Sequence, residues 1–381
     1  MDDFKDFNII LINLDGLRQD RIDYCPTLAS LRDSSYYFSG MKTVAPYTFA
    51  SLHAIFSGMY PSKNGVNAYY NILKFNKDFT TIAQLLKKYN YYTSCDVIST
   101  AVMPKQGIDD WNVFNEENID FRQRHTDLIR SLSDKGKFFL FLHYTEIHKN
   151  LVREIVQKYK NDDDDYFNSK DENENRYNSH LPACDNYVKS IIDTLSECNL
   201  TEKTILIFFS DHGTSIGEKK GEKFYGVFVY DYTLNVFCIL HTPKITPKIV
   251  NKQCRTIDIF PTIAEIVGEP SNTMTEIQGE SLFSLLNDSN APDREVFVET
   301  GGLYGPWPSP RKHNVFCIRT KINKLIYNDT PETWELYNLD TDPNEINNCY
   351  DENSPIVIQM KKRLSHYFKI NNIENNFTSK F

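Results

Sequence analysis

The sequence predicts an α/β fold: a mostly parallel central sheet with helices on both faces, followed by a smaller C-terminal α+β lobe. Three observations predict it. Short apolar runs, such as 8–14 and 204–210, are rich in Ile and Phe and have the length of buried parallel strands. Segments with helical spacing separate these runs. After about residue 288 the apolar runs become shorter and are separated by turns. A chain of 381 residues is long enough for one large domain and a smaller companion.

The alternation of strands and helices can be followed through the first part of the chain. Apolar residues keep helical spacing over 82–89, behind Thr80 and Thr81, which are suited to cap a helix. Strands are expected at 91–98, 138–142 and 235–241. Further helices are expected at 188–195 and 257–267, the second closed by Gly268. We therefore predict one catalytic domain over 1–288.

The remaining segment, 289–381, is predicted to form the α+β lobe. Short strands with turns between them are expected at 296–298, 315–319, 324–327 and 334–339. A helix over 355–368 follows them. This pattern predicts a small subdomain that packs on the first domain.

One segment, 158–180, carries two acidic runs, 162–165 and 171–175. This composition favours a solvated, mobile loop. The alternative is a lid over a site. The spacing and the glycine of an EF-hand are absent, so we do not expect a calcium loop.

Charge and composition exclude several classes of protein. The formal net charge is −9, so the chain lacks the excess of Lys and Arg that general nucleic-acid binding needs. No apolar stretch has the length of a transmembrane helix, and the acidic segment 1–6 is unlike a signal peptide. The eight cysteines form no Cys-x-x-Cys pair and are expected to be reduced. We expect a cytoplasmic protein without nucleic-acid or membrane partners; a homo-oligomer is left open.

Two of the apolar runs stop at an acid. The run 8–14 leads into Asp15, and the run 204–210 leads into Asp211 and His212. Ligands of open α/β sheets lie beyond the carboxyl ends of the strands, so these three side chains are expected to converge. Two carboxylates and one imidazole suit a single divalent ion, with Mn²⁺ or Zn²⁺ preferred and Mg²⁺ or Ca²⁺ also compatible.

Thr48 opens a helix-like stretch that stops at Gly58. A hydroxyl at a helix N-terminus meets unpaired N–H groups and the positive end of the dipole, which favour an alkoxide and an anionic substrate. A metal ion would lower the pKa of this hydroxyl further. The alternative is that Thr48 only caps the helix.

Taken in order, these segments resemble the sulfatase-like branch of the alkaline phosphatase superfamily. The resemblance rests on Asp15 with the segment 16–20, on 48–66, on 139–148, on 210–218 and on 334–345. Each motif alone is weak, but all of them in this order are specific and cover nearly the whole chain. The resemblance implies an alkaline phosphatase-like fold.

The resemblance also implies a role for each candidate residue. The single metal ion would be bound by Asp15, Thr48, Asp211 and His212. Thr48 would be the nucleophile, His148 would contact the substrate and protonate the leaving group, and Lys324 would contact the anion.

Each of the less certain positions has a plainer alternative. His148 could be a structural loop histidine, and Lys324 a solvated lysine at a strand start. We expect His143 to be a core residue and His53 to lie on a helix face.

One departure from the family decides the predicted chemistry. True sulfatases use a Cys or Ser, in a Cys-x-Pro-Ser-Arg context, that is oxidised to formylglycine, whereas this chain has the segment Thr48–Leu52, with Ala50 and Leu52 in place of the proline and arginine. Threonine is not a substrate for that oxidation, so no formylglycine is expected. An ester formed on Thr48 must instead be cleared by water or another acceptor, and phosphorus accepts such in-line attack.

We therefore predict a metal-dependent phosphoesterase, acting on a phosphomonoester, phosphodiester or phosphonate ester, or a phospho-group transferase. The expected substrate is a small-molecule or glycan-linked phosphate ester. The first alternative is a sulfuric-ester hydrolase that lacks formylglycine. The second is a non-catalytic binding protein on the same fold.

Overall fold

A computed structural model describes residues 4–159, 163–243, 245–288, 290–302 and 313–377. Its central sheet has eight strands: β1 (Asn8–Leu14), β2 (Tyr36–Phe38), β4 (Tyr92–Val97), β5 (Asp110–Val113), β6 (Phe138–Tyr144), β7 (Thr204–Phe209), β8 (Cys238–His241) and β9 (Lys248–Val250). Their order is β5-β4-β6-β1-β7-β8-β2-β9. All neighbouring pairs are parallel except β7–β8 and β2–β8. Strands β3 (Met41–Lys42) and β10 (Cys254–Arg255) form a separate parallel pair.

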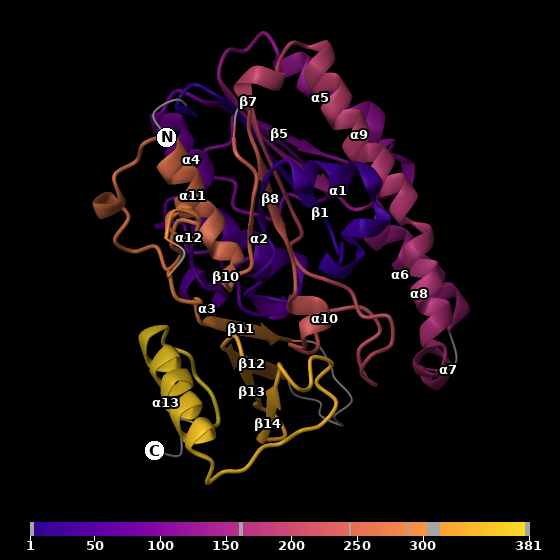
Figure 1. Cartoon of the computed structure of the whole chain (residues 1–381), viewed down its shortest axis with the longest axis vertical. Helices are drawn as coiled ribbons and strands as arrows, with labels where there is room; N and C mark the ends of the chain where they lie inside the picture. The colour runs from indigo at the N-terminus through magenta and orange to yellow at the C-terminus, as the bar shows by residue number, and fades with distance from the viewer. Residues whose placement is uncertain (1–3, 160–162, 244, 289, 303–312, 378–381) are drawn as a thin grey trace.

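Helices cover both faces of this sheet (Figure 1). The helices of the first domain are α1 (Pro26–Asp33), α2 (Thr48–Ser57), α3 (Pro61–Asn64), α4 (Ile82–Lys88), α5 (Phe121–Leu132), α6 (Glu146–Lys158), α7 (Asp163–Asn168), α8 (Lys170–Ser179), α9 (Leu181–Glu197), α10 (Asp231–Leu234), α11 (Ile259–Ile266) and α12 (Phe283–Asn287). Side chains of β1 alternate between two hydrophobic cores. Ile9 and Leu11 pack with α2, α4 and α11, whereas Ile10, Ile12 and Leu14 pack with α1, α5 and α9. This burial on both faces explains why β1 is apolar apart from Asn8 at its start and Asn13 near its end.

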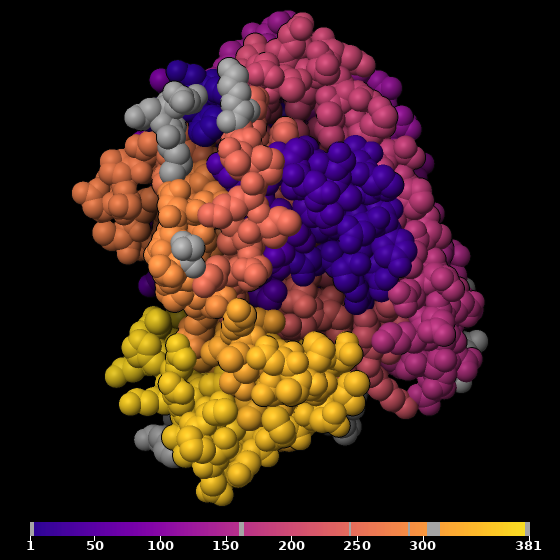
Figure 2. Space-filling view, viewed as in Figure 1, coloured from indigo at the N-terminus to yellow at the C-terminus, as the bar shows by residue number. Residues whose placement is uncertain are grey.

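A second, four-stranded antiparallel sheet follows in the order β11-β12-β13-β14. Its strands are β11 (Val296–Gly301), β12 (Asn314–Arg319), β13 (Asn323–Asn328) and β14 (Thr333–Asn338), and α13 (Pro355–Ile370) packs beside it. This lobe sits at one end of the molecule (Figures 1 and 2). The predicted fold class, a mostly parallel sheet with helices plus a C-terminal α+β lobe, is confirmed; the boundary at 288 stays a prediction.

The structure corrects the expectation of a loop over the acidic segment. Its described part, 163–179, forms α7 and α8. Tyr166, Asn173 and Tyr177 are fully buried there, so one face of these helices packs while the acidic face meets water. The acidic composition of the segment suggested a solvated loop. The three buried residues were overlooked because acidic residues separate them in the sequence. Strands β2, β5 and β9 were also missed, since each has only three or four residues, too few for a strand pattern to be recognised.

None of the helices among the described residues combines the length and apolar character needed to cross a membrane.

Candidate metal and nucleophile site

The central strands bring Asp15, Asp211 and His212 to one edge of the sheet. Strands β1 and β7 are parallel neighbours with Asn13 opposite Phe209, so the residues that follow them emerge side by side. The side chain of Asn13 fixes this junction, because its Oδ1 accepts a hydrogen bond from the N–H of Asp211 at 3.1 Å. The predicted convergence at the carboxyl ends of the strands is thus what the topology produces.

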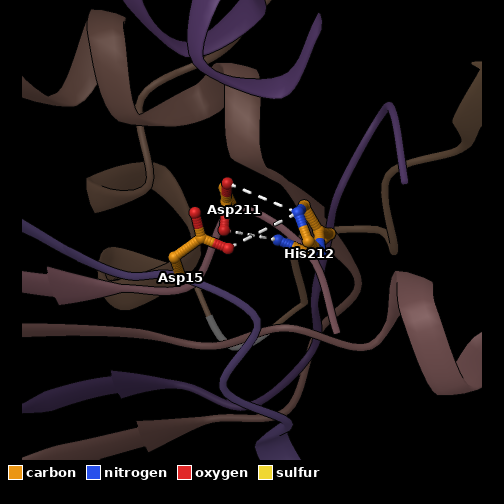
Figure 3. A group of neighbouring side chains, drawn as sticks. All are labelled: Asp15, Asp211 and His212. Atoms are coloured by element: carbon orange, nitrogen blue, oxygen red, sulfur yellow. Dashed lines mark hydrogen bonds and ion pairs between the residues drawn. The ribbon is translucent and has the colours of Figure 1, made fainter. Parts of the chain in front are cut away.

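The three side chains point toward one another (Figure 3). One ligand atom from each lies within 4.8 Å of the other two. Nε2 of His212 is 3.7 Å from Oδ1 of Asp15 and 3.7 Å from Oδ2 of Asp211. Both of these carboxylate oxygens are buried, and neither has a hydrogen-bond partner among the described residues. Oxygens of this kind are costly to bury unless a cation or a donor reaches them.

The pKa values of the two carboxyl groups are shifted in opposite directions. Burial raises the pKa of Asp15, but the imidazoles of His148, His143 and His212 outweigh burial and hold this pKa well below its ordinary value. Burial and the neighbouring charge of Asp15 raise the pKa of Asp211. Two acids this close repel each other when both are ionised, and a divalent cation between them removes that penalty. The donor set of two oxygens and one imidazole therefore fits a divalent metal ion.

Thr48 is the first residue of α2, and Tyr47 occupies the cap position. The Thr48 hydroxyl does not cap the helix. It lies 3.1 Å from Nε2 of His212 and 3.4 Å from Oδ2 of Asp15. One turn later, Ser51 ties α2 to the second strand end by donating to the carbonyl of Asp211 at 2.9 Å. The alternative of a simple N-cap is therefore not what the structure shows.

His148 lies in the first turn of α6 rather than in a loop. Its Nδ1 is 3.7 Å from Oδ1 of Asp15, and its side chain is 18% exposed, more than those of Asp15 and His212. On the other side of the ring, Nε2 lies 3.2 Å from the hydroxyl of Tyr225. His148 thus joins the buried cluster to the accessible side of the site, where a leaving group would be protonated.

Tyr225 is a site residue that sequence reasoning missed. Its ring stacks on His212 with 4.2 Å between ring centroids, besides its contact with His148. The residue stands in an irregular segment between β7 and α10, where no periodicity or motif singles it out.

His143 corrects the expectation of a core histidine. It is fully buried, but its Nε2 lies 2.8 Å from Oδ2 of Asp15. Strand β6 places it there, because Asn13 of β1 is its register partner and Asp15 follows two residues later. A signal was present: His143 stands near the carboxyl end of a strand, where the ligand side of the sheet lies.

Lys324 is not brought to this cluster, and its predicted contact with the anion needs correction. The ammonium is fully buried on β13, 2.8 Å from Oδ1 of Asp231 and 2.8 Å from Oε1 of Glu345. Arg319 also pairs with Asp231, at 2.7 Å. Lys324 therefore belongs to a buried ion-pair network, with no exposed surface for an anion to contact. His53 is buried on α2, and its Nδ1 lies 2.8 Å from the carbonyl of Phe49.

The comparison with known proteins identifies the family. A family profile described as Sulfatase matches residues 2–269, which is more than half of the chain. The chain belongs to the sulfatase family. A second profile, N-sulphoglucosamine sulphohydrolase, C-terminal, matches residues 221–369. The resemblance to the sulfatase-like branch of the superfamily is confirmed.

Individual relatives of this sulfatase-family chain are distant. A protein named Sulfatase from Formosa agariphila is 27% identical over 274 residues, which cover 65% of this chain and 48% of that protein. The chain thus spans about half the length of this relative. A protein solved with its substrate D-glucosamine-2-N,6-O-disulfate is 16% identical, with a TM-score of 0.75 and coverage of 96% of this chain and 98% of that chain. The phosphonate monoester hydrolase from Silicibacter pomeroyi is 15% identical, with a TM-score of 0.76 and coverage of 96% of both chains.

These findings favour the predicted alternative, hydrolysis of a sulfuric ester, over hydrolysis of a phosphoric ester. The named sequence relative is a sulfatase, and the matching profiles describe sulfatases. The preference for phosphoric over sulfuric esters, which was predicted from Thr48, has no support from this sequence relative or from the two profiles.

Proposed function

We propose that this chain is a metal-dependent hydrolase of sulfuric esters in which Thr48 acts without conversion to formylglycine. The observation that carries the proposal is the place of the Thr48 hydroxyl, 3.1 Å from Nε2 of His212 and 3.4 Å from Oδ2 of Asp15. The hydroxyl also stands at the N-terminus of α2, where the helix dipole favours a developing negative charge. The choice of a sulfuric ester rests on family membership and on the named relative.

Asp15, Asp211 and His212 would hold one divalent ion, with Mn²⁺ or Zn²⁺ preferred for this mixed donor set. Bound there, the ion would lower the pKa of a neighbouring hydroxyl and stabilise negative charge on the group transferred. Elemental analysis of the purified protein, and loss of activity on chelation with recovery on adding MnCl₂ or ZnCl₂, test this part.

The chain's own residues supply the remaining steps. The Thr48 oxygen bonds to sulfur as the bond from sulfur to the ester oxygen breaks, and the Thr48 proton passes to solvent. His148 gives its proton to the departing alkoxide, which leaves as the alcohol. Water then attacks the sulfur of the sulfated threonine and the bond from sulfur to the Thr48 oxygen breaks; one proton of the water restores the Thr48 hydroxyl, the other returns to His148, and sulfate leaves. The substrate class proposed is a small-molecule or glycan-linked sulfate, by analogy with the neighbour solved with a disulfated glucosamine.

A phosphoric- or phosphonate-ester hydrolase or transferase is the second candidate. Two observations favour it: threonine cannot form the aldehyde that expels sulfate, and the fold is shared with a phosphonate monoester hydrolase. A non-catalytic binding protein is the third candidate.

One substrate panel separates the three candidates. Four substrates are assayed side by side with the metal-loaded protein: 4-nitrophenyl sulfate, 4-nitrophenyl phosphate, the phosphodiester bis(4-nitrophenyl) phosphate and 4-nitrophenyl phenylphosphonate. We expect the highest kcat/KM on the sulfate ester. Faster turnover of any phosphorus ester would replace our proposal with the second candidate, and no turnover of any ester by metal-loaded protein would favour the third.

A further inference from the structure

Helices α7 and α8 lie against both loops that carry the candidate metal ligands. The acidic side chains of Asp164, Asp165, Asp171 and Glu172 on these helices are exposed. On the opposite face, Tyr166, Asn173 and Tyr177 are fully buried. Figure 1 shows the two helices at one edge of the molecule, beyond α6. Each of these three buried side chains has a polar atom that hydrogen-bonds to the backbone of a loop beside the candidate metal ligands.

Tyr177 holds the turn that follows Asp15. Its hydroxyl donates a hydrogen bond to the carbonyl of Gly16 at 2.9 Å and accepts one from the N–H of Arg18 at 2.8 Å. Gly16 has a φ of +70°, in the left-handed region that favours glycine, so the turn depends on an unusual backbone conformation. A single tyrosine hydroxyl thus satisfies two backbone groups of the turn.

Tyr166 and Asn173 hold the loop that follows His212. The Tyr166 hydroxyl lies 3.1 Å from the carbonyl of Ser215, and Nδ2 of Asn173 donates to the carbonyl of Ile216 at 3.3 Å. The two loops also contact each other, because Thr214 donates to the carbonyl of Gly16 at 3.0 Å. Helices α7 and α8 therefore contact both halves of the candidate metal site at once.

We propose that Tyr177 is a positioning residue for the metal ion, and that docking of α8 and binding of the metal stabilise each other. The inference rests on the metal site of the proposed function. Without a cation, Asp15 and Asp211 repel each other, and the loops must be held together against that repulsion. Hydrogen bonds that fix ligands from outside the metal shell commonly change metal affinity by about 10–100-fold. Coupling between two binding events is reciprocal, so the metal must stabilise the docked helices by the same factor.

The first test compares Tyr177→Phe with Tyr187→Phe in the full chain. Tyr187, on α9, is also fully buried, and its hydroxyl lies 2.7 Å from Nδ1 of His125, away from both loops. Affinities for MnCl₂ and ZnCl₂ are measured by competition with a chromogenic chelator. We expect Tyr177→Phe to bind the metal about 10–100-fold more weakly than wild type, and Tyr187→Phe to bind like wild type. Equal affinities of the two variants would overturn the inference.

The second test uses wild type alone, so it holds even if a variant fails to fold. Amide hydrogen exchange over 163–179 is followed with and without MnCl₂. We expect exchange there to slow when the metal binds, and an unchanged rate would also overturn the inference. A wild-type protein that binds neither metal ion would instead refute the metal site of the proposed function, so the two failures are distinguishable.

Discussion

Nε2 of His143 lies 2.8 Å from Oδ2 of Asp15, so a buried imidazole on β6 holds a carboxylate at the end of β1. This contact engages one oxygen of Asp15 and leaves Oδ1, which has no hydrogen-bond partner among the described residues, directed at the cluster. The hydrogen bond from His143 therefore orients the Asp15 carboxylate so that Oδ1 faces the position a metal ion would occupy.

Replacing His143 by Phe is expected to weaken metal binding by about 10–100-fold, because Asp15 would lose the donor that orients it. Phe is a suitable replacement, since the ring already packs near Phe114 and Phe141. The measurement is metal affinity by chelator competition. His125→Phe is the control, because His125 is equally buried beside a carboxylate, Asp96, outside the cluster. Equal affinities of the two variants would contradict the role of His143.

Thr48→Val should lower kcat by about 10³-fold or more, since it removes the proposed nucleophile while nearly keeping the shape of the side chain. Metal affinity should fall far less, because Asp15, Asp211 and His212 remain. The control is Thr194→Val: Thr194 is also a buried helical threonine, whose hydroxyl bonds only to the carbonyl of Ser190 among its described contacts. Undiminished turnover by Thr48→Val would rule out Thr48 as the nucleophile.

The sequence allowed the central strands and the Asp15–Asp211–His212 convergence to be predicted, for one physical reason. Strands buried on both faces are mostly apolar, so the ends of β1 and β7 are visible where the first acid appears. His143 and Tyr225 were not predicted, because their contacts depend on which strand lies beside β1 and on the path of an irregular loop. Lys324 was misplaced because a buried lysine with two carboxylate partners has the same local sequence as a solvated one.

His148→Gln is expected to lower kcat, and the loss should be larger for substrates with a poorer leaving group. General-acid catalysis contributes about 10²–10⁴-fold when an alkoxide must be protonated, and little when the leaving group is stable as an anion. We expect a large loss of kcat on an alkyl or sugar ester and a small loss on the 4-nitrophenyl ester. Tyr225→Phe, which removes the hydroxyl 3.2 Å from Nε2 of His148, should show the same trend more weakly. Equal losses on both substrates would indicate that His148 binds the anion without donating a proton.

Lys324→Met should destabilise the fold by about 3–5 kcal/mol, because it leaves Glu345 buried without its cation, while Asp231 keeps its pair with Arg319. KM should stay unchanged, since Lys324 has no exposed surface. Urea unfolding measures the first effect and steady-state kinetics the second. Lys189→Met is the control: its ion pair with Asp193 is exposed and should contribute no more than about 1 kcal/mol. A raised KM with an unchanged free energy of unfolding would restore Lys324 as a substrate-binding residue.

Glu222 should make the free energy of unfolding fall as pH rises from about 4.5 to 7. Its carboxylate is buried, with Oε1 accepting from the N–H groups of Val227 and Phe228 at 2.7 and 2.8 Å. Burial raises its pKa from 4.5 to about 7, the hydrogen bonds only partly opposing the rise. In that pH window the folded protein keeps a proton that the unfolded chain releases, so folding becomes less favourable by up to about 3 kcal/mol and then levels off above pH 7.

Glu222→Gln keeps the oxygen that accepts both N–H groups and removes the titration. Relative to wild type, the variant should therefore gain stability between pH 5 and pH 8, as measured by urea unfolding at both values. A constant difference for Glu222→Gln would mean that Glu222 stays ionised in the folded protein. The Glu222 carboxyl accepts from the N–H of Val227, so it fixes the loop that contains Tyr225, whose ring stacks on His212.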